Sequence, residues 1–236
     1  MEAEPAVTTR RPLVIAHRGF SAKYPENTLA AVRAALDLGV DYVEIDVQET
    51  RDGKLIVFHD YRLNRLCGVR GRIRDTTLAE MKLLNPAIPL LSEVLHMCHR
   101  RARLLIEIKG AHPRKVADEI QRLDMVDEAI VFSLSIPCVK ALAAANPRIP
   151  RFGLIARNLK SRIADLESSV AVRGIGVNRR LVTAPEVVRI VHRRSWKLFV
   201  WTVNRAAEMQ RLAAWGVDGL ITNHPDRALE TLNFEL

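Results

Sequence analysis

Carboxylates alternate with apolar residues in two short runs of the chain. The run YVEIDV, residues 42–47, places Glu44 and Asp46 two positions apart, and the run IEIK, residues 106–109, repeats the spacing with Glu107 and Lys109. Side chains two residues apart on a β-strand point to the same face. Because burying a bare carboxylate among apolar groups costs several kcal/mol, these charges must gather where water or a cation can reach them.

Three oxygen ligands from neighbouring strands favour a hard cation. Glu44, Asp46 and Glu107 would converge on one point, and carboxylates of this kind suit Mg2+ or Ca2+. The alternative is an ordinary ionic cluster, in which Glu107 pairs with Lys109 and the other two carboxylates bind arginines from the loops. We predict one divalent cation, Mg2+ or Ca2+, because other reactive groups also fall at strand ends.

Two histidines follow predicted strands at this same end. His17 comes directly after the first strand, in the run HRG, and His59 stands beside Asp60 at the end of an extension of the second strand. A lone histidine is more often structural, but two beside a carboxylate cluster can exchange protons with a reacting oxygen. We therefore predict that His17 and His59 are catalytic. Arg18 could offer its planar guanidinium to a phosphate.

Trp201 is a further candidate at a strand end. It lies in the run VWTVN, residues 200–204, where the seventh predicted strand finishes. Its ring could form an apolar wall for the carbon part of a ligand, and packing in the core explains it equally well.

The elements that must carry these side chains alternate between strand and helix patterns. Short β-branched or apolar runs are separated by amphipathic segments, which is typical of βαβ units around a parallel sheet. The predicted strands are residues 13–16, 42–47, 104–109, 129–132, 151–155, 174–177, 197–203 and 218–221. The predicted helices are residues 28–38, 92–101, 114–123, 137–145, 185–192 and 206–215, with a weaker pattern over 158–172.

Eight such units in 236 residues predict a closed TIM (β/α)8 barrel, for which about 250 residues is typical. A doubly wound open sheet is the alternative. It is disfavoured because neither a G-x-G-x-x-G run nor a P-loop follows the first strand. We expect the barrel domain to cover residues 13–236 and a flexible N-terminal segment to cover residues 1–12.

One stretch interrupts the alternation, at residues 53–89 between the second strand and its helix. We expect this short insertion to contain a hairpin extension at 55–59 and a helix at 78–84, and long structured loops of this kind are often functional. The part after the second histidine is rich in arginine, with Arg62, Arg65, Arg70, Arg72 and Arg74.

Composition and charge limit the class of protein. Hydrophobic residues make up 48% and charged residues 27%, and no apolar run approaches the roughly 18 residues of a membrane helix. The first twelve residues do not resemble a secretory signal, so we predict a cytoplasmic location. The three cysteines, an odd number without a C-x-x-C pair, argue against a disulfide framework and against structural zinc.

The net charge of +9 indicates an anionic partner and is unevenly distributed. Residues 141–236 hold 15 Lys and Arg against 8 Asp and Glu, a difference of +7. A phosphate-bearing small molecule, a lipid surface or a nucleic acid would fit this charge. Because only 5% of the residues are aromatic, a base-stacking platform has little material, and we predict no nucleic-acid partner.

The motifs around these residues resemble the glycerophosphodiester phosphodiesterase family. The runs AHRG (16–19) and YPENTL (24–29) are similar to its HRG…PENT signature, and EIDV (44–47), TRDG (50–53) and HD (59–60) are similar to its next block. The runs IEIK (106–109), WTVN (201–204) and GVDGLIT (216–222) follow in the expected order. The resemblance covers residues 13–227.

This resemblance implies a TIM barrel that uses a divalent cation to hydrolyse glycerophosphodiesters to an alcohol and glycerol 3-phosphate. Matching positions imply metal ligands at Glu44, Asp46 and Glu107, an acid and a base at His17 and His59, and phosphate contacts at Arg18 and Lys109. Whether water attacks phosphorus directly, or the substrate's own hydroxyl first forms a cyclic phosphate, stays open.

Departures from the family pattern bear on the substrate. The run SLS (133–135) stands where the family often has SFD, and TNHP (222–225) stands where T-D-x-P is common, so both positions lose a carboxylate. The shorter insertion could leave the mouth open to bulkier diesters. A lysophospholipase D-type activity on lipid diesters, with peripheral contact to an anionic membrane, is therefore an alternative to a small-molecule diester substrate. A third hypothesis is a catalytically inactive phosphodiester-binding protein. The sequence does not indicate the oligomeric state.

Overall fold

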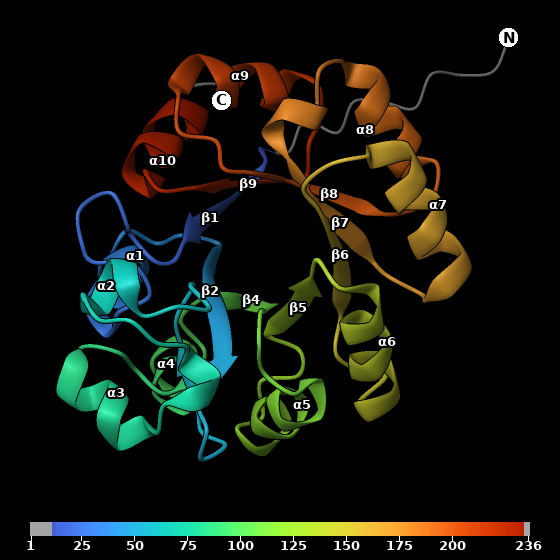
Figure 1. Cartoon of the computed structure of the whole chain (residues 1–236). Coiled ribbons are helices and arrows are strands. Elements are labelled where there is room, and N and C mark those ends of the chain that lie inside the picture. Colours follow the sequence, from blue (N-terminus) through green and yellow to red (C-terminus); the bar gives the residue numbers. More distant parts are fainter. Residues whose placement is uncertain (1–10, 234–236) are drawn as a thin grey trace, which may run out of the picture.

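The computed structural model describes residues 11–233, and eight of its strands form a closed parallel ring (Figure 1). Strand β1 pairs with β2 on one side and with β9 on the other, so no edge of the ring is left open. The ring strands are β1 Leu13–His17, β2 Tyr42–Glu49, β4 Arg103–Ile108, β5 Ala129–Ser133, β6 Arg151–Ile155, β7 Gly174–Asn178, β8 Lys197–Trp201 and β9 Gly219–Thr222. The predicted TIM barrel is confirmed.

Helices surround the ring and bury one apolar face each against it. In α5, Val116, Ala117 and Ile120 are buried at helical spacing, and the hydroxyl of Thr28 caps α1 by accepting from Ala31 N. The outer helices are α1 Leu29–Asp37, α4 Leu91–Cys98, α5 Pro113–Arg122, α6 Ile136–Ala145, α7 Leu159–Ser169, α8 Pro185–His192, α9 Ala206–Ala214 and α10 Pro225–Asn233. The weakly patterned segment 158–172 does contain a helix, and α10 was not predicted.

The barrel interior is a packed core below the carboxyl-terminal ends of the strands. It is distinct from the larger apolar layer between the strands and the helices. Ring stacking contributes to it, because the centroids of Phe152 and Phe199 lie 4.9 Å apart. This interior cluster contains Ile15, Tyr42, Leu105, Phe132, Phe152, Leu154, Phe199 and Ile221. Charged side chains can therefore enter the barrel only above this layer.

The insertion after β2 builds a small unit of its own beside the mouth, drawn in cyan and green (Figure 1). It contains β3 Leu55–Val57 antiparallel to β2, α2 Asn64–Cys67, the 3-10 turn Ile73–Asp75 and α3 Leu78–Leu84. The predicted helix at 78–84 is confirmed. The predicted strand extension to residue 59 is too long, because the chain leaves β2 after Val57 to present His59.

Other boundaries differ by one to three residues, the most at the ends of α4 and α7, which stop at Cys98 and Ser169 and not at 101 and 172. Strand β8 ends at Trp201 and not at 203, and β9 covers Gly219–Thr222 and not 218–221. Residues 1–10 lie outside the described part of the chain, so the flexible segment 1–12 stays a prediction. Within residues 11–233, every helix is too short or too polar to cross a bilayer.

Candidate active site

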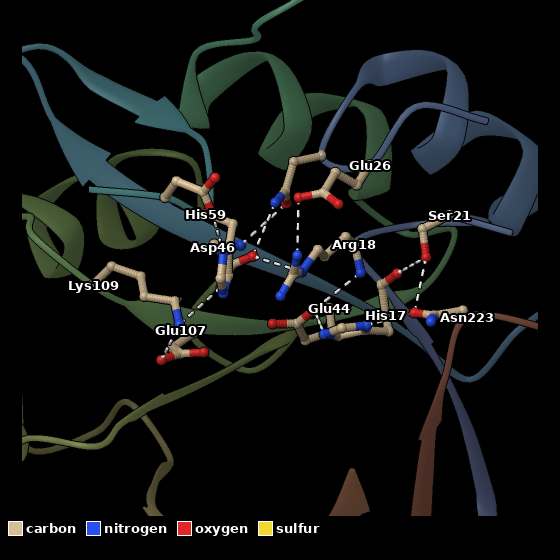
Figure 2. Close-up of polar contacts among 12 residues, drawn as sticks. His17, Arg18, Ser21, Glu26, Glu44, Asp46, His59, Glu107, Lys109 and Asn223 are labelled. Carbon is tan, nitrogen blue, oxygen red and sulfur yellow. Dashed lines mark hydrogen bonds and ion pairs between the residues drawn. The ribbon is translucent and has the colours of Figure 1, made fainter. Parts of the chain in front are cut away.

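Strands β2 and β4 bring the three predicted carboxylates into one buried cluster (Figure 2). The strands pair in parallel with Asp46 opposite Glu107, and Glu44 lies two residues earlier on the same face. One oxygen from each carboxylate lies within 4.8 Å of the others, and all three residues are buried.

The cluster carries more negative charge than its surroundings neutralise. Burial, followed by repulsion from Asp46, raises the pKa of Glu44 well above its ordinary value. The same two causes raise the pKa of Glu107 to about 7. Burial would also raise the pKa of Asp46, but Arg18 and Lys109 outweigh it and lower that pKa. A further positive charge would stabilise all three ionised carboxylates.

Two cations already contact this cluster. Arg18 places Nε 3.1 Å from Asp46 Oδ2 and Nη1 2.9 Å from Glu26 Oε1. Lys109 Nζ lies 2.9 Å from Glu107 Oε1. Burial alone would lower the pKa of Lys109, but the nearby carboxylates outweigh burial and raise this pKa. Of the ion pairs in the alternative sequence interpretation, those of Glu107 and Asp46 are therefore present together with the carboxylate triad, whereas Glu44 accepts from the backbone N–H of Arg18 instead.

The donor set fits a hard divalent cation. Ligand oxygens lie about 2.0–2.1 Å from Mg2+ and 2.3–2.6 Å from Ca2+, so two oxygens on opposite sides of one ion are about 4–5 Å apart. The oxygens of Glu44, Asp46 and Glu107 meet this limit at 4.8 Å. The burial of all three carboxylates and the raised pKa values of Glu44 and Glu107 give the site a reason to bind positive charge.

His17 lies at the end of β1, with its two ring nitrogens in different environments. Nδ1 donates to Oδ1 of Asn223 at 2.6 Å, and Nε2 lies 3.9 Å from Glu44 Oε2. Burial, followed by the nearby charge of Arg18, lowers the pKa of His17 to about 4. The imidazole is therefore neutral at pH 7, with its second nitrogen directed towards the carboxylates.

His59 is oriented by its neighbour and by the insertion. Its Nδ1 lies 2.6 Å from Asp60 Oδ1, and Arg65 Nε donates to Asp60 Oδ2 at 2.7 Å. The hydrogen bond from Arg65 is the main cause that lowers the pKa of Asp60 to about 2. Arg65 also lies 2.6 Å from Glu26, the carboxylate that holds Arg18, so helix α2 connects both halves of the site.

The loop after β1 fixes the central carboxylate from above. Asn27 donates from Nδ2 to Asp46 Oδ2 at 2.9 Å and accepts from the Asp46 backbone N–H at 3.2 Å. Its backbone adopts a φ of +58°, an uncommon conformation that asparagine tolerates better than most residues. This double contact holds Asp46 in one orientation.

One small cavity of about 90 Å³ joins these groups. His17, Glu44, His59 and Lys109 line its polar side. Trp201 lines the other side and also packs on the interior cluster, so its contact with the core is confirmed and its contact with a ligand stays a prediction. The apolar lining is completed by Phe132, Leu134, Leu154 and Ile221.

The sequence analysis did not predict five residues that contact the site. Asn223 follows β9 at the same end of the barrel, and its place in the departing TNHP run was the only available signal. Glu26, Asn27 and Asp60 stood inside the quoted motifs without an assigned role. Nothing in the sequence distinguished Arg65 from the other arginines of the insertion.

Comparison with known proteins agrees with this geometry. Residues 17–227 match the glycerophosphoryl diester phosphodiesterase family. A glycerophosphodiester phosphodiesterase from Bacillus altitudinis is 31% identical over 242 residues, which cover 92% of this chain and 96% of the relative. The crystal structure of a glycerophosphodiester phosphodiesterase from Thermotoga maritima superposes with a TM-score of 0.79 at 30% identity, covering 94% of this chain and 98% of that one.

A third protein shares the fold at lower identity. The Oleispira antarctica phosphodiesterase, determined in complex with the product sn-glycerol-3-phosphate, has a TM-score of 0.80 at 23% identity, covering 94% of this chain and 97% of that one. The fold and the family match together define an enzyme that hydrolyses phosphoric diesters. The chain belongs to the glycerophosphoryl diester phosphodiesterase family, as its motifs predicted.

Proposed function

We propose that this enzyme hydrolyses glycerophosphodiesters to an alcohol and glycerol 3-phosphate, with one divalent cation held by Glu44, Asp46 and Glu107. The observation that carries the proposal is the buried triad within 4.8 Å, with two histidines lining the same cavity. The product complex of the Oleispira antarctica protein supports glycerol 3-phosphate as the product. Mg2+ and Ca2+ both fit the oxygen donors.

Charge neutralisation is the main contribution of the cavity to a phosphoryl displacement. A divalent cation, when bound, polarises the phosphoryl oxygens. Lys109 and Arg18 place cationic groups against the same carboxylates, with side chains that are 12% and 16% exposed. In this proposal they contact the phosphate as well, which holds phosphorus between the two imidazoles.

The two histidines suit opposite proton transfers. His17 is neutral, and because its Nδ1–H is engaged by Asn223, Nε2 is free to accept a proton from the attacking oxygen. The carboxylate of Asp60 holds Nδ1 of His59 at 2.6 Å, which directs Nε2 of this ring to donate a proton to the leaving alkoxide. The attacking oxygen belongs either to water or to a free hydroxyl of the substrate.

An assay with two soluble diesters tests the proposal. Purified enzyme should release glycerol 3-phosphate from glycerophosphocholine and glycerophosphoethanolamine, and a chelator should abolish the release until Mg2+ or Ca2+ is restored. Turnover unchanged by the chelator would refute the metal mechanism. Binding of either diester without any product would favour an inactive phosphodiester-binding protein.

The second candidate activity is of lysophospholipase D type. Apolar side chains at the cavity rim and on the insertion favour it, because Leu134 is 43% exposed and Leu83 is 85% exposed. An acyl chain could lie on such a surface, with peripheral contact to an anionic membrane. Comparing kcat/KM on lysophosphatidylcholine and on glycerophosphocholine separates the two, since a mouth that rejects acyl chains would act only on the second. The cytoplasmic location stays a prediction.

A further inference from the structure

Two arginines of the insertion stand directly opposite each other beside the mouth. Arg62 and Arg72 form an isolated antiparallel backbone bridge. The backbone N–H groups of Leu63 and Ile73 donate across the two segments at 3.1 and 3.2 Å, on either side of the bridge. Arg62 and Arg72 thus form a non-hydrogen-bonded antiparallel pair, the kind of pair in which opposing side chains lie closest in a sheet. We call Arg62 and Arg72 the arginine pair.

The arginine pair lacks an anionic partner. Both side chains are exposed, and within residues 11–233 no carboxylate lies within 4.0 Å of either. Asp75 and Glu80 line the adjoining groove, but Asp75 pairs with Arg74, and Glu80 caps α3. Like charges placed directly opposite each other destabilise a strand pair. An anion bound between the two guanidinium groups would remove this repulsion.

The cleft under the arginine pair adjoins the catalytic groups. It has a volume of about 460 Å³ and is also lined by Tyr61, Gln48 and Gly110. The Tyr61 hydroxyl donates to the backbone carbonyl of Lys109 at 3.3 Å. The Gln48 amide donates to the backbone carbonyl of His59 at 3.2 Å. The floor of the cleft is therefore the same backbone that carries Lys109 and His59.

The catalytic cavity is narrow, with a volume of about 90 Å³, which suits the phosphoryl group and its immediate ligands better than a whole diester. The alcohol part of a bound diester must therefore extend over the rim. One side of the cavity is apolar, with Leu134 and Trp201. On the side of Lys109 and His59, hydrogen bonds from Tyr61 and Gln48 link the cavity to the cleft of the arginine pair.

We propose that the arginine pair is a subsite for a second anionic group, a phosphate or a carboxylate, on the alcohol part of the substrate. The preferred substrates are then glycerophosphodiesters whose alcohol carries its own negative charge. Arginine suits this role because its planar fork binds phosphate and carboxylate through two hydrogen bonds. The inference rests on the proposed diesterase activity and names the substrate class of that site.

Two substrates that differ by one glycerophosphoryl group, which carries the second charge, test the subsite. Glycerophosphoglycerol has a neutral glycerol as its alcohol, and bis(glycerophospho)glycerol has the same glycerol bearing a second phosphodiester. The wild-type enzyme should prefer the second by kcat/KM beyond the twofold excess of scissile bonds. In the variant Arg62→Gln/Arg72→Gln, this preference should fall by about tenfold. A preference that is unchanged in the variant would overturn the subsite.

A charge-matched control lies at the opposite end of the barrel. Arg173 and Arg193 are both exposed; Arg173 directly precedes β7, and Arg193 follows α8 four residues before β8, at the ends of the strands remote from the mouth. The variant Arg173→Gln/Arg193→Gln should keep the wild-type preference. An equal fall in this control would show that net charge, and not the arginine pair, selects the substrate.

A measurement without turnover separates this inference from the proposed function. Inorganic phosphate should raise the melting temperature of the wild-type protein more than that of Arg62→Gln/Arg72→Gln. If the wild type hydrolyses neither diester but keeps this difference, the proposed activity fails and the anion subsite stands. If vesicles of phosphatidylglycerol bind through the arginine pair while the preference between soluble diesters does not depend on it, the anion is a lipid headgroup, and the substrate subsite is refuted.

Discussion

The imidazole of His17 is held by an uncharged partner, because its Nδ1 lies 2.6 Å from the amide oxygen of Asn223. This contact joins the ends of β1 and β9, which are neighbours in the ring. The Ser21 hydroxyl lies 3.1 Å from the same oxygen and donates to the His17 carbonyl at 2.7 Å, so the partner is itself positioned (Figure 2). The amide fixes the tautomer, and it raises the pKa of His17 too little to offset burial and the charge of Arg18.

Replacing this amide by a carboxylate should change the pH dependence of the reaction. In Asn223→Asp, a negative charge beside Nδ1 stabilises the protonated ring, so the pKa of His17 rises from about 4. The acid limb of kcat/KM should then move to higher pH by about one unit or more. Rate profiles of wild type and variant measure this shift.

The variant Asn223→Ala provides the control. It removes the hydrogen bond without adding charge, so turnover should fall while the acid limb does not move upward. If both variants shift the limb equally, the Nδ1 contact does not set the protonation of His17.

Removing the imidazole of either His17 or His59 should nearly abolish turnover. His17→Ala and His59→Ala should each lower kcat by about 100-fold or more, because positioned acid–base groups contribute about 10²- to 10⁴-fold. His96→Ala is the matched control, since His96 is exposed on α4 and bonds only the backbone of Ser92. Steady-state kinetics of the three variants decide, and near-normal turnover of His17→Ala or His59→Ala would remove that residue from the mechanism.

The three carboxylates that would bind the cation should make the folded protein less stable when no cation is present. Burial raises the pKa of Glu44, so its ionised form opposes folding at every pH above its ordinary value near 4.5. Glu44→Gln keeps an acceptor for the Arg18 backbone N–H, which donates to Glu44 at 2.9 Å. With a chelator present, the free energy of unfolding of Glu44→Gln should exceed that of the wild type by about 1 to 2 kcal/mol.

The same substitution should weaken cation binding. Calorimetric titration with Mg2+ or Ca2+ should show an affinity for Glu44→Gln at least about tenfold lower than for wild type, since one charged ligand is lost. If Glu44→Gln is less stable than the wild type in chelator and binds the cation with equal affinity, the assignment of the triad is contradicted.

The ion pair between Asp60 and Arg65 should contribute stability that acid removes. Arg65 lowers the pKa of Asp60 to about 2, so the contribution is complete above the ordinary pKa of 3.8 and is lost as the pH falls towards 2. Because Arg65 is 48% exposed, solvent screening limits the contribution to about 1 kcal/mol. Urea unfolding of wild type and Asp60→Asn should differ by this amount at pH 6 and converge near pH 2. A constant difference would assign the effect to packing.

The sequence predicted the barrel because its strands and helices follow local rules. Alternation of apolar runs with amphipathic segments depends only on neighbouring residues, and the spacing of Glu44 and Asp46 on one strand face follows from strand geometry. Convergence with Glu107 followed from placing the strands side by side, which the parallel register of β2 and β4 bears out.

Contacts that cross between loops were not predictable in the same way. Asn223 meets His17 across 206 residues of sequence, and Arg65 meets Glu26 across 39. No local pattern encodes such a pairing, because it depends on how the loops fold at the mouth. The position of Arg62 opposite Arg72 could not be predicted from the sequence either, since their bridge depends on the path of the insertion.

A pair of glycines tests how tightly the loop after β1 is packed on the barrel. Gly19 and Gly39 adopt nearly the same backbone, with φ of +75° and +74°. A Cβ on Gly19 would lie 2.5 Å from the backbone carbon of Ala31, whereas a Cβ on Gly39 would meet nothing within 4 Å. Gly39→Ala should therefore cost only the backbone strain, about 1 kcal/mol, and Gly19→Ala should cost about 3 kcal/mol or more.

Only the change at Gly19 should also impair catalysis. Gly19 follows Arg18, whose backbone N–H donates to Glu44 and whose side chain lies against Asp46, so a displaced loop would move both carboxylate contacts. Urea unfolding and kcat/KM of the two variants measure the separate effects. If Gly19→Ala and Gly39→Ala lose the same free energy of unfolding, position 19 requires glycine for its backbone conformation and not for its contact with α1.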